Sequence, residues 1–401
     1  MEGDFIKINK WLLPLSWLYG IGVKFRNLCF ETGILKSRSF DIPVISVGNI
    51  TVGGTGKTPH VEYLTKILQE HFKVAILSRG YKRKTKGFVL ANEKSTVADI
   101  GDEPRQMKKK YPHATIAVDS DRCHGIDMLG TIEDTKDIDV VVLDDAFQHR
   151  YITPGINILL VDYHRLIIYD ELLPAGRLRE PLTGKNRADI VIVTKCPTNL
   201  KPMEFRVITK AMNLYPYQKL YFTTLEYQNL VSINADKQLP LSQLTADMNI
   251  LVLSGIASPQ QMMIDLKYYT QRIYPLTFSD HHPFKAKDIE LIRHTYENMP
   301  SPKIIITTEK DAVRLEHMDG LGDDVRSQMY VLPLEIKFLL DQNNMFNQNI
   351  IDYVRKNSRD SILAQAKDDN SSQDSNHSGN RPGTISFRNY RQTRDPLFRD
   401  S

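Results

Sequence analysis

The chain has 401 residues, of which 41% are hydrophobic and 25% charged, and its formal net charge at pH 7 is +4. This length predicts two or three domains with a large core, and the small net charge gives no indication of a nucleic-acid partner. The three widely spaced cysteines, Cys29, Cys123 and Cys196, form neither a disulfide framework nor a zinc pattern, so we expect each of them to serve in packing.

The first distinctive segment is the apolar stretch "WLLPLSWLYGIGV", from Trp11 to Val23, which has cationic residues on both sides. It is shorter than the roughly 18 apolar residues of a membrane span, and it lacks the cleavage site of a signal peptide. A helix here would be apolar over most of its circumference and would need burial in protein or in lipid. Tryptophans and flanking cations suit a membrane interface, and docking on the core is the alternative.

From Asp41 to Thr194, short runs rich in valine and isoleucine alternate with helical stretches. The runs are "PVISV", "KVAIL", "ATIAV", "DVVVL", "INILLV" and "DIVIVT". Runs that are apolar on both faces are typical of buried parallel strands. The pattern therefore predicts an α/β, doubly wound domain over residues 36–220, preceded by an N-terminal apolar helix within residues 1–35.

The pattern changes after residue 220. Residues 221–240 alternate in a way that predicts a linker ribbon. A second, smaller α/β domain is expected over residues 241–355, with strands at "NILVLSG", "PKIIITTEKD" and "QMYVLPL". Residues 356–401 are rich in Ser, Asn, Asp, Gln and Arg, which predicts a disordered polar tail.

A glycine-rich segment follows the first predicted strand, in "VISVGNITVGGTGKTP". Its context is that of a P-loop, in which backbone N–H groups at a strand–helix junction surround phosphates, a lysine reaches the β- and γ-phosphates and a hydroxyl binds Mg²⁺. The pattern G-x-x-x-x-G-K-[ST] is met except that Thr51 replaces the first glycine. A glycine-rich turn without a ligand is the alternative. The predicted phosphate-binding residues are Thr51, Val52, Gly53, Gly54, Thr55, Gly56, Lys57 and Thr58.

Two acidic residues end another predicted strand, in "DVVVLDDAFQHR". Asp144 and Asp145 would lie at the carboxyl end of a parallel sheet, where ligands bind in open α/β folds. A carboxylate there can hold the Mg²⁺ of the P-loop together with Thr58. The alternative is a pair of acidic helix caps.

Other polar segments are weaker indications when taken singly. "DIGDEPRQM" offers Asp102 and Glu103 before a predicted helix, and "SDHHPF" offers Asp280, His281 and His282. A histidine near a carboxylate can form an acid–base pair. Basic residues in "SRGYKRKTKG" and "AGRLREPL" could hold an anionic substrate or form a solvated face. "VIVTKCP" has Pro197 where a guanine-binding motif requires Asp, so it does not support GTP specificity.

These segments together resemble the tetraacyldisaccharide 4′-kinase family, the lipid A 4′-kinases of Gram-negative bacteria. The similarity runs from about Trp11 to Lys337. It rests on "VGNITVGGTGKTP", "LSRGY", "GDEP", "LDDAFQHR", "LLPAGRLREPL", "SGIASP", "FSDHHPF" and "TTEKDAVRL" in this order. In this family a residue such as threonine at the first P-loop position is normal.

The resemblance implies transfer of the γ-phosphate of ATP to the 4′-hydroxyl of a tetraacyldisaccharide 1-phosphate. It implies ATP and Mg²⁺ as cofactors, with Lys57 catalytic, and Asp102 and His281 as the pair that activates the hydroxyl. It also implies a peripheral enzyme on the cytoplasmic face of the inner membrane, which favours the membrane interpretation of the N-terminal helix. Candidates for binding the acceptor are Arg79, Arg177, Arg179 and Glu180.

Two other functions remain as hypotheses. A P-loop GTPase or metallochaperone-like switch would hydrolyse nucleotide without a lipid acceptor, but Pro197 and the apolar N-terminal segment argue against it. A non-enzymatic membrane adaptor with a relic nucleotide fold is disfavoured because Lys57, Thr58, Asp144 and Asp145 are all present.

Overall fold

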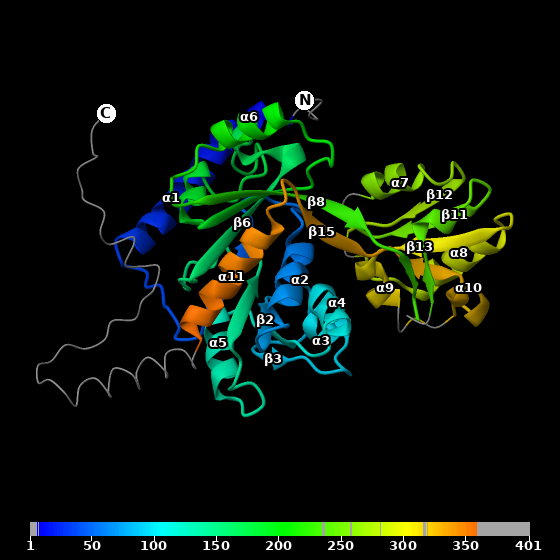
Figure 1. The fold of residues 1–401 in the computed structure, drawn as a ribbon, viewed down its shortest axis with the longest axis horizontal. Coiled ribbons are helices and arrows are strands. Elements are labelled where there is room, and N and C mark those ends of the chain that lie inside the picture. The colour runs from blue at the N-terminus through cyan, green and yellow to red at the C-terminus, as the bar shows by residue number, and fades with distance from the viewer. Residues whose placement is uncertain are drawn as a thin grey trace, which may run out of the picture.

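The computed structural model describes residues 6, 8–234, 237–256, 259–280, 282–315, 318 and 320–358. Its strands form two sheets, and Figure 1 shows them as two units joined through β8 and β15. The expected α/β class is confirmed, although both sheets are mixed rather than wholly parallel.

The larger sheet has nine strands in the order β15-β8-β7-β6-β1-β5-β2-β4-β3. Its strands are β1 (Val44–Gly48), β2 (Val74–Ser78), β3 (Val89–Leu90), β4 (Thr115–Val118), β5 (Val140–Asp144), β6 (Ile156–Asp162), β7 (Ile190–Thr194), β8 (Lys219–Tyr227) and β15 (Leu334–Phe338). The two edge strands, β3 and β15, pair antiparallel to their neighbours, and the other pairs are parallel. The inner strands are buried on both faces, as their valine- and isoleucine-rich runs predict.

The smaller sheet has six strands in the order β10-β9-β14-β13-β11-β12. They are β9 (Leu230–Ser232), β10 (Gln238–Leu239), β11 (Asn249–Ser254), β12 (Ile273–Thr277), β13 (Lys303–Thr307) and β14 (Met329–Val331). The β9–β14 and β9–β10 pairs are antiparallel, and the remaining pairs are parallel.

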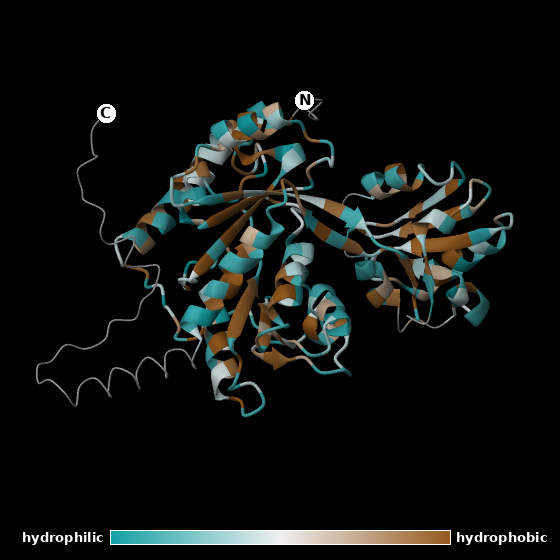
Figure 2. Ribbon diagram, in the orientation of Figure 1, coloured by the Kyte–Doolittle hydropathy of each residue, from teal (hydrophilic) through white to brown (hydrophobic). Residues whose placement is uncertain are grey.

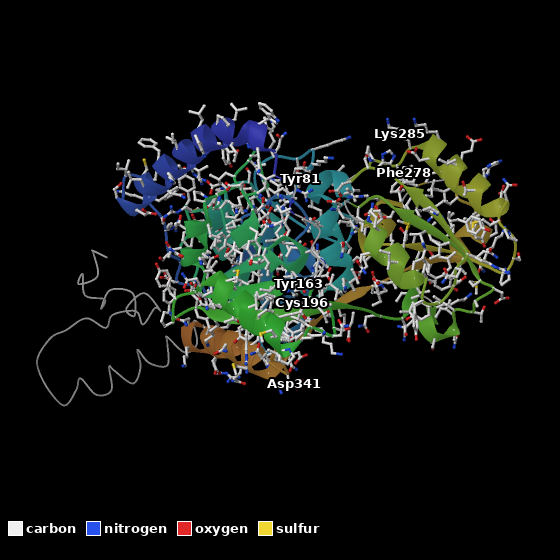
Figure 3. All side chains as sticks on the ribbon, turned by 90° about the horizontal axis from the view of Figure 1, so that it is seen from above. Tyr81, Tyr163, Cys196, Phe278, Lys285 and Asp341 are labelled. Carbon is white, nitrogen blue, oxygen red and sulfur yellow. The ribbon has the colours of Figure 1, made fainter. Side chains whose placement is uncertain are left out.

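Helices cover both faces of the larger sheet. Figure 3 shows α1 and α11 on opposite sides of it, and Figure 2 shows that its strands are mostly hydrophobic. The helices are α1 (Leu13–Glu31), α2 (Lys57–Leu68), α3 (Val97–Ile100), α4 (Asp102–Lys110), α5 (Arg122–Thr131), α6 (Pro202–Met212), α7 (Gln260–Leu266), α8 (Ala286–Glu297), α9 (Glu309–Leu315), α10 (Asp323–Ser327) and α11 (Asn343–Asn357). One core cluster joins α2 and α11 to the sheet, and others join α5 and α6 to its opposite face. This is the two-sided arrangement that a doubly wound fold requires.

Strand pairing divides the chain differently from the sequence pattern. β8, within the expected linker ribbon, belongs to the larger sheet, and Tyr221 on it is fully buried. β15 and α11, expected in the second domain, also return to the larger sheet, where Phe338 and Phe346 pack with rings 4.6 Å apart. The domain limits 1–35, 36–220, 221–240 and 241–355 stay a prediction, and the tail 356–401 lies outside the described residues from residue 359 onward.

The N-terminal segment forms α1, preceded by a short 3-10 turn at Lys10–Leu12. Within the described part of the chain, no helix combines the length and the hydropathy that a membrane span needs. Figure 3 shows α1 along one flank of the larger unit.

Candidate functional site

The phosphate loop connects β1 to α2, as the sequence predicts. Gly53 and Gly56 adopt φ angles of 118° and 84°, a region that glycine enters without the steric cost of a Cβ atom. Gly56 caps α2, which begins at Lys57, so the first N–H groups of the helix point toward the space above the loop. This arrangement suits a phosphate group.

The place of Thr51 in the loop explains why glycine is not needed there. Thr51 is buried and forms an antiparallel bridge with Leu178. Among the described residues it is not one of those with positive φ. Its carbonyl accepts a hydrogen bond from Nε of Arg179 at 2.9 Å. The first position of this loop is therefore an extended segment fixed by a neighbouring chain rather than a tight turn.

The rest of the loop is fixed by side chains from within the same unit. Nδ2 of Asn49 donates to Oγ1 of Thr55 at 2.8 Å, and Oγ1 of Thr194 donates to the Thr55 carbonyl at 2.9 Å. Nζ of Lys195 donates to the Gly54 carbonyl and lies 2.7 Å from Oδ2 of Asp162. Thr194 and Lys195 of the segment "VIVTKCP" therefore support the phosphate loop. The partial similarity of this segment to a guanine-binding motif did not indicate that role.

Two carboxylates stand beside the loop, as predicted from "LDDAFQHR". Asp144 ends β5 in register with Val47 of β1, and Nζ of Lys57 lies 3.8 Å from Oδ1 of Asp145. Asp145 has a φ of 48°, the left-handed turn in which the chain leaves the sheet. The pair therefore faces the start of α2 from the adjacent strand.

Asp144 is held in an environment that disfavours its charge. Its side chain is buried, and Oδ2 accepts a hydrogen bond from Oγ of Ser78 at 3.2 Å. Burial, together with the nearby carboxylates of Glu103 and Asp145, raises the pKa of Asp144 to about 7, against the lowering effect of Lys57 and Arg122. A buried carboxylate with such neighbours is suited to binding a cation.

Asp102 begins α4 and is buried; its Oδ1 accepts a hydrogen bond from the Glu103 N–H at 3.0 Å, and two cationic partners come from the other unit. The Arg314 guanidinium of α9 donates to Oδ2 of Asp102. Nζ of Lys310, one turn earlier on α9, lies 3.8 Å from the same oxygen and 3.3 Å from Oε1 of Glu103. The carboxylate at this edge of the larger sheet is thus held by the smaller unit.

His281, expected to pair with Asp102, lies outside the described residues. Its neighbour Asp280 is 4.0 Å from Nζ of Lys310, so the segment approaches the ammonium that Asp102 also approaches. His282 has a different environment, because Nε2 lies 2.9 Å from Oδ2 of Asp288 and the ring stacks on Phe278. The choice of His281 for the acid–base pair stays a prediction.

The four residues expected to bind an acceptor fall into two groups. Arg79 and Arg177 are exposed. Arg179 instead faces the phosphate loop, where it also lies 3.8 Å from Oδ2 of Asp145. Glu180 is buried and forms an ion pair with Arg187 at 2.8 Å. Arg79 and Arg177 are therefore the members of this set that remain accessible to a ligand.

Sequence reasoning missed the parts of the site that act through tertiary contacts. Gln148 donates to the Asn49 carbonyl at the start of the phosphate loop, and Lys310 and Arg314 reach Asp102 from α9. The available signal was "TTEKDAVRL", in which a lysine and an arginine four residues apart share one helix face.

Helix α1 rests directly on the loops that form the site. Oγ of Ser16 donates to the Leu172 carbonyl at 3.0 Å, and the hydroxyl of Tyr19 donates to the Arg179 carbonyl at 2.8 Å. The Arg26 guanidinium donates to the Gln148 carbonyl at 3.0 Å. The opposite face of the helix is apolar and exposed, with Trp11, Leu15, Trp17, Leu18, Ile21, Phe25 and Leu28 each more than half accessible.

Comparisons with known proteins agree on one family. A family model described as LpxK, tetraacyldisaccharide-1-P 4′-kinase, matches residues 8–355. The chain is 58% identical over 363 residues to the tetraacyldisaccharide 4′-kinase of Phocaeicola vulgatus, a match that covers 90% of this chain and 99% of that protein. It is 42% identical over 350 residues to that of Flavobacterium johnsoniae, covering 87% and 98%. A crystal structure of the "apo" form of LpxK from Aquifex aeolicus in complex with ATP is similar at a TM-score of 0.66 and 30% identity, covering 86% of this chain and 98% of that one.

Proposed function

Because this chain belongs to the tetraacyldisaccharide-1-P 4′-kinase family, we propose that it transfers the γ-phosphate of ATP to the 4′-hydroxyl of tetraacyldisaccharide 1-phosphate. The product is lipid IVA, in the pathway of lipid A biosynthesis. The observation that carries this proposal is that the phosphate loop adjoins the Asp144–Asp145 pair, with Glu103, next to Asp102, close enough to raise the pKa of Asp144. The donor, its metal and the acceptor base would meet there.

ATP binding is assigned to residues 51–58. The N–H groups of the loop and of the first turn of α2 bind the phosphates, and Lys57 reaches the β- and γ-phosphates. The triphosphate would draw the Lys57 ammonium away from Asp145, which it approaches to 3.8 Å. That exchange leaves both aspartates available to a cation.

The residues present fit a magnesium ion. Oδ1 of Asp144 and Oδ1 of Asp145 are both buried and receive no hydrogen bond from the described residues. Mg²⁺ prefers carboxylate and hydroxyl oxygens, so Thr58, Asp144 and Asp145 would hold it directly or through water. The ion would neutralise charge on the transferring phosphoryl group. The bound ion would also place a positive charge next to the Asp144 carboxylate.

The acceptor hydroxyl needs a base, and we assign that role to Asp102, supported by His281. A sugar hydroxyl is a weak nucleophile at neutral pH, and a positioned carboxylate can take its proton as the new bond forms. Arg314 forms an ion pair with Asp102 and fixes its orientation. Arg79 and Arg177 are proposed to contact the anionic acceptor.

The acyl chains of such an acceptor would stay in the bilayer, and α1 is proposed to hold the enzyme at the cytoplasmic face of the inner membrane. Trp11 is 93% and Trp17 69% exposed, on an apolar face that the described residues leave uncovered. Apolar residues on one face of a helix, with tryptophans among them, suit insertion at the headgroup level. The helix would thereby bring the site to the lipid.

A direct assay tests the reaction. The full chain is incubated with γ-labelled ATP, Mg²⁺ and tetraacyldisaccharide 1-phosphate in mixed micelles, and the lipid is extracted. We expect label on the lipid, with GTP a poor donor. Label released only as inorganic phosphate, equally from GTP, would favour the switch hypothesis and contradict the kinase proposal.

A separate assay tests the membrane contact. The variant Trp11→Ser/Trp17→Ser/Phe25→Ser is compared with wild type in vesicle flotation, with the exposed polar-face change Lys66→Ser on α2 as a matched control. We expect the triple variant to lose most of its vesicle binding and to keep its ATP affinity. Equal flotation of the two proteins would contradict the proposal.

A further inference from the structure

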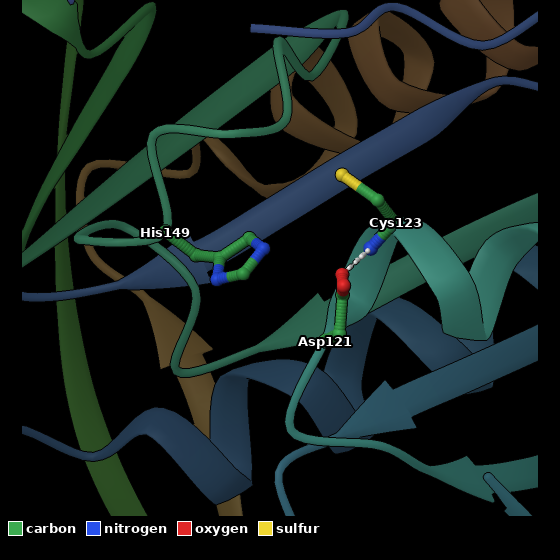
Figure 4. A group of neighbouring side chains, drawn as sticks. All are labelled: Asp121, Cys123 and His149. Carbon is green, nitrogen blue, oxygen red and sulfur yellow. Dashed lines mark hydrogen bonds between the residues drawn. The ribbon is translucent and has the colours of Figure 1, made fainter. Parts of the chain in front are cut away.

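Three side chains with metal-binding atoms meet on the side of the larger unit near the start of α5. Asp121 caps this helix, Cys123 lies in its first turn, and His149 comes from the loop after β5 (Figure 4). Their donor atoms all lie within 4.8 Å of one another. The sequence predicts a packing role for Cys123, and the structure shows its side chain half-buried within this mixed cluster.

Asp121 and Cys123 each have a donor atom to offer. Oδ1 of Asp121 accepts hydrogen bonds from the N–H groups of Cys123 at 2.9 Å and His124 at 3.3 Å, which fixes the carboxylate and leaves Oδ2 for a ligand. The Cys123 thiol donates to the Tyr151 carbonyl at 3.6 Å. A thiol is a weak donor, so this hydrogen bond is readily exchanged for a stronger interaction.

His149 is held in the protonation state that metals require. Burial lowers its pKa to about 4, assisted by the Arg122 guanidinium, so its ring is neutral at pH 7. Nε2 is buried, and it has no hydrogen-bond partner in the part of the chain that the structure describes. Figure 4 shows the ring directed toward Cys123 and Asp121. A buried, unpartnered nitrogen is costly unless a ligand satisfies it.

We propose that Asp121, Cys123 and His149 form a site for one zinc-class divalent cation. Thiolate sulfur, imidazole nitrogen and carboxylate oxygen are the ligands that zinc takes in proteins, with water in the fourth position. Ligand atoms of a tetrahedral zinc ion lie roughly 3.5 Å apart, so side-chain rotations that move these atoms by about 1 Å would bring them to that spacing. As the ion binds, the Cys123 thiol releases its proton to solvent and the sulfur forms the metal bond.

The charges around the cluster act in both directions. Arg122 and Arg79 face His149 and disfavour a cation. Asp127 lies near Cys123 and Asp119 near Arg122, and both favour a cation, but Arg38 forms an ion pair with Asp127 and opposes one. The thiolate formed on binding adds a further negative charge, which moves the balance toward the cation.

The site would connect α5 to the loop after β5. His149 directly follows Gln148, which donates to the Asn49 carbonyl at the start of the phosphate loop. The same loop carries Asp145. An ion on His149 would therefore restrain the segment between Asp145 and Tyr151.

Cobalt(II) is the probe that tests the site, because a cobalt–thiolate bond gives a charge-transfer absorption band. The chelator-treated full chain is titrated with Co²⁺, and the change Cys123→Ser is compared with the matched control Cys196→Ser. We expect the band to saturate at one equivalent, to disappear on addition of Zn²⁺, to be absent in C123S and to persist in C196S. No band in the wild-type protein, or an undiminished band in C123S, would overturn the proposal.

A second pair of measurements covers the case of a misfolded serine variant. Asp121→Asn keeps the helix cap, because asparagine caps as well as aspartate, but removes the carboxylate. We expect D121N to bind Co²⁺ more than about tenfold more weakly, and Zn²⁺ to raise the Tm of wild type but not of D121N. Equal Co²⁺ affinity in D121N and wild type, or an unchanged wild-type Tm, would count against the site.

Discussion

The phosphate loop and Asp102 share one edge of the larger sheet, but they are held in different ways. The loop receives its supporting hydrogen bonds from Asn49, Arg179, Thr194 and Lys195, all within the same unit. Asp102 is held by Arg314 and approached by Lys310, both on α9 of the smaller unit. One end of the site is therefore preformed, while the other depends on how the smaller unit is placed.

This difference teaches where each half of the reaction is controlled. Support from a single unit makes nucleotide binding a local property, which changes in α9 leave intact. Support from across the two units makes the proton-accepting end sensitive to the contact between α4 and α9. That contact also includes Lys110, whose ammonium lies 2.7 Å from Glu62 of α2 and 2.8 Å from Glu309 of α9. Perturbing the two ends separately should give different kinetic signatures.

The largest effect is expected at the preformed end. Lys57→Ala removes the ammonium that we propose reaches the β- and γ-phosphates, and we expect kcat to fall by about 10³-fold or more. Lys66→Ala on the exposed side of the same helix is the control and should leave the rate unchanged. Lipid phosphorylation measured at saturating ATP decides it, and a Lys57→Ala enzyme with near-wild-type turnover would refute the P-loop assignment.

The next effect is expected at Asp102. Asp102→Asn keeps the size of the side chain and removes the proposed base, so kcat should fall by about 10²- to 10⁴-fold, while the KM for ATP changes little. Glu93→Gln, at an exposed position before α3, is the control. If Asp102→Asn raises the KM for ATP while kcat stays near the wild-type value, Asp102 acts in nucleotide binding and not as the base.

A smaller effect is expected from the partner of Asp102 across the two units. Arg314→Met should lower kcat by about 10- to 100-fold, since it leaves a buried carboxylate without its guanidinium, and ATP affinity should stay the same. Arg314→Lys should recover part of the rate. The surface pair Arg293–Glu297 supplies the control Arg293→Met. If Arg314→Met weakens ATP binding by the same factor as it lowers kcat, nucleotide binding also depends on α9, and the two ends of the site are not held independently.

The smallest effect concerns stability at the metal-binding edge. The folded state raises the pKa of Asp144 to about 7, so it binds the proton more tightly than the unfolded chain does. The stability that this carboxyl group contributes is fully present below about pH 4 and is lost as pH rises through about 7. In the absence of Mg²⁺ and nucleotide, Asp144→Asn should therefore raise Tm at pH 8 by roughly 2–4 °C.

Thermal unfolding across this pH range provides the check on Asp144. The gain in Tm over wild type should shrink toward pH 4, where the wild-type carboxyl is also neutral. Exposed Asp134→Asn serves as the control and should show no such dependence. A gain of the same size at pH 4 and pH 8 would show that the charge of Asp144 is not its cause.

The sequence predicted those parts of the site that depend on neighbouring residues in the chain. The run from Val44 to Thr58 specifies a strand, a glycine turn and a helix start within one segment, and Asp144 follows from a strand end. Arg314 was not predicted, because its contact with Asp102 joins residues 212 positions apart. The return of β15 and α11 to the larger sheet was missed for the same reason: local patterns carry no information about which sheet a strand joins.

The contact between Tyr19 and the Arg179 carbonyl determines how far the phosphate loop lies from the apolar face of α1. One residue joins the two structures, since the Arg179 backbone meets α1 while its side chain holds the Thr51 carbonyl of the phosphate loop. If the apolar face of α1 lies among lipid headgroups, α1 itself and Arg179 separate them from the phosphate loop. The sugar hydroxyl of a lipid acceptor would then react while the acyl chains of that lipid stay in the hydrocarbon. The helix would set the distance between the membrane surface and the nucleotide.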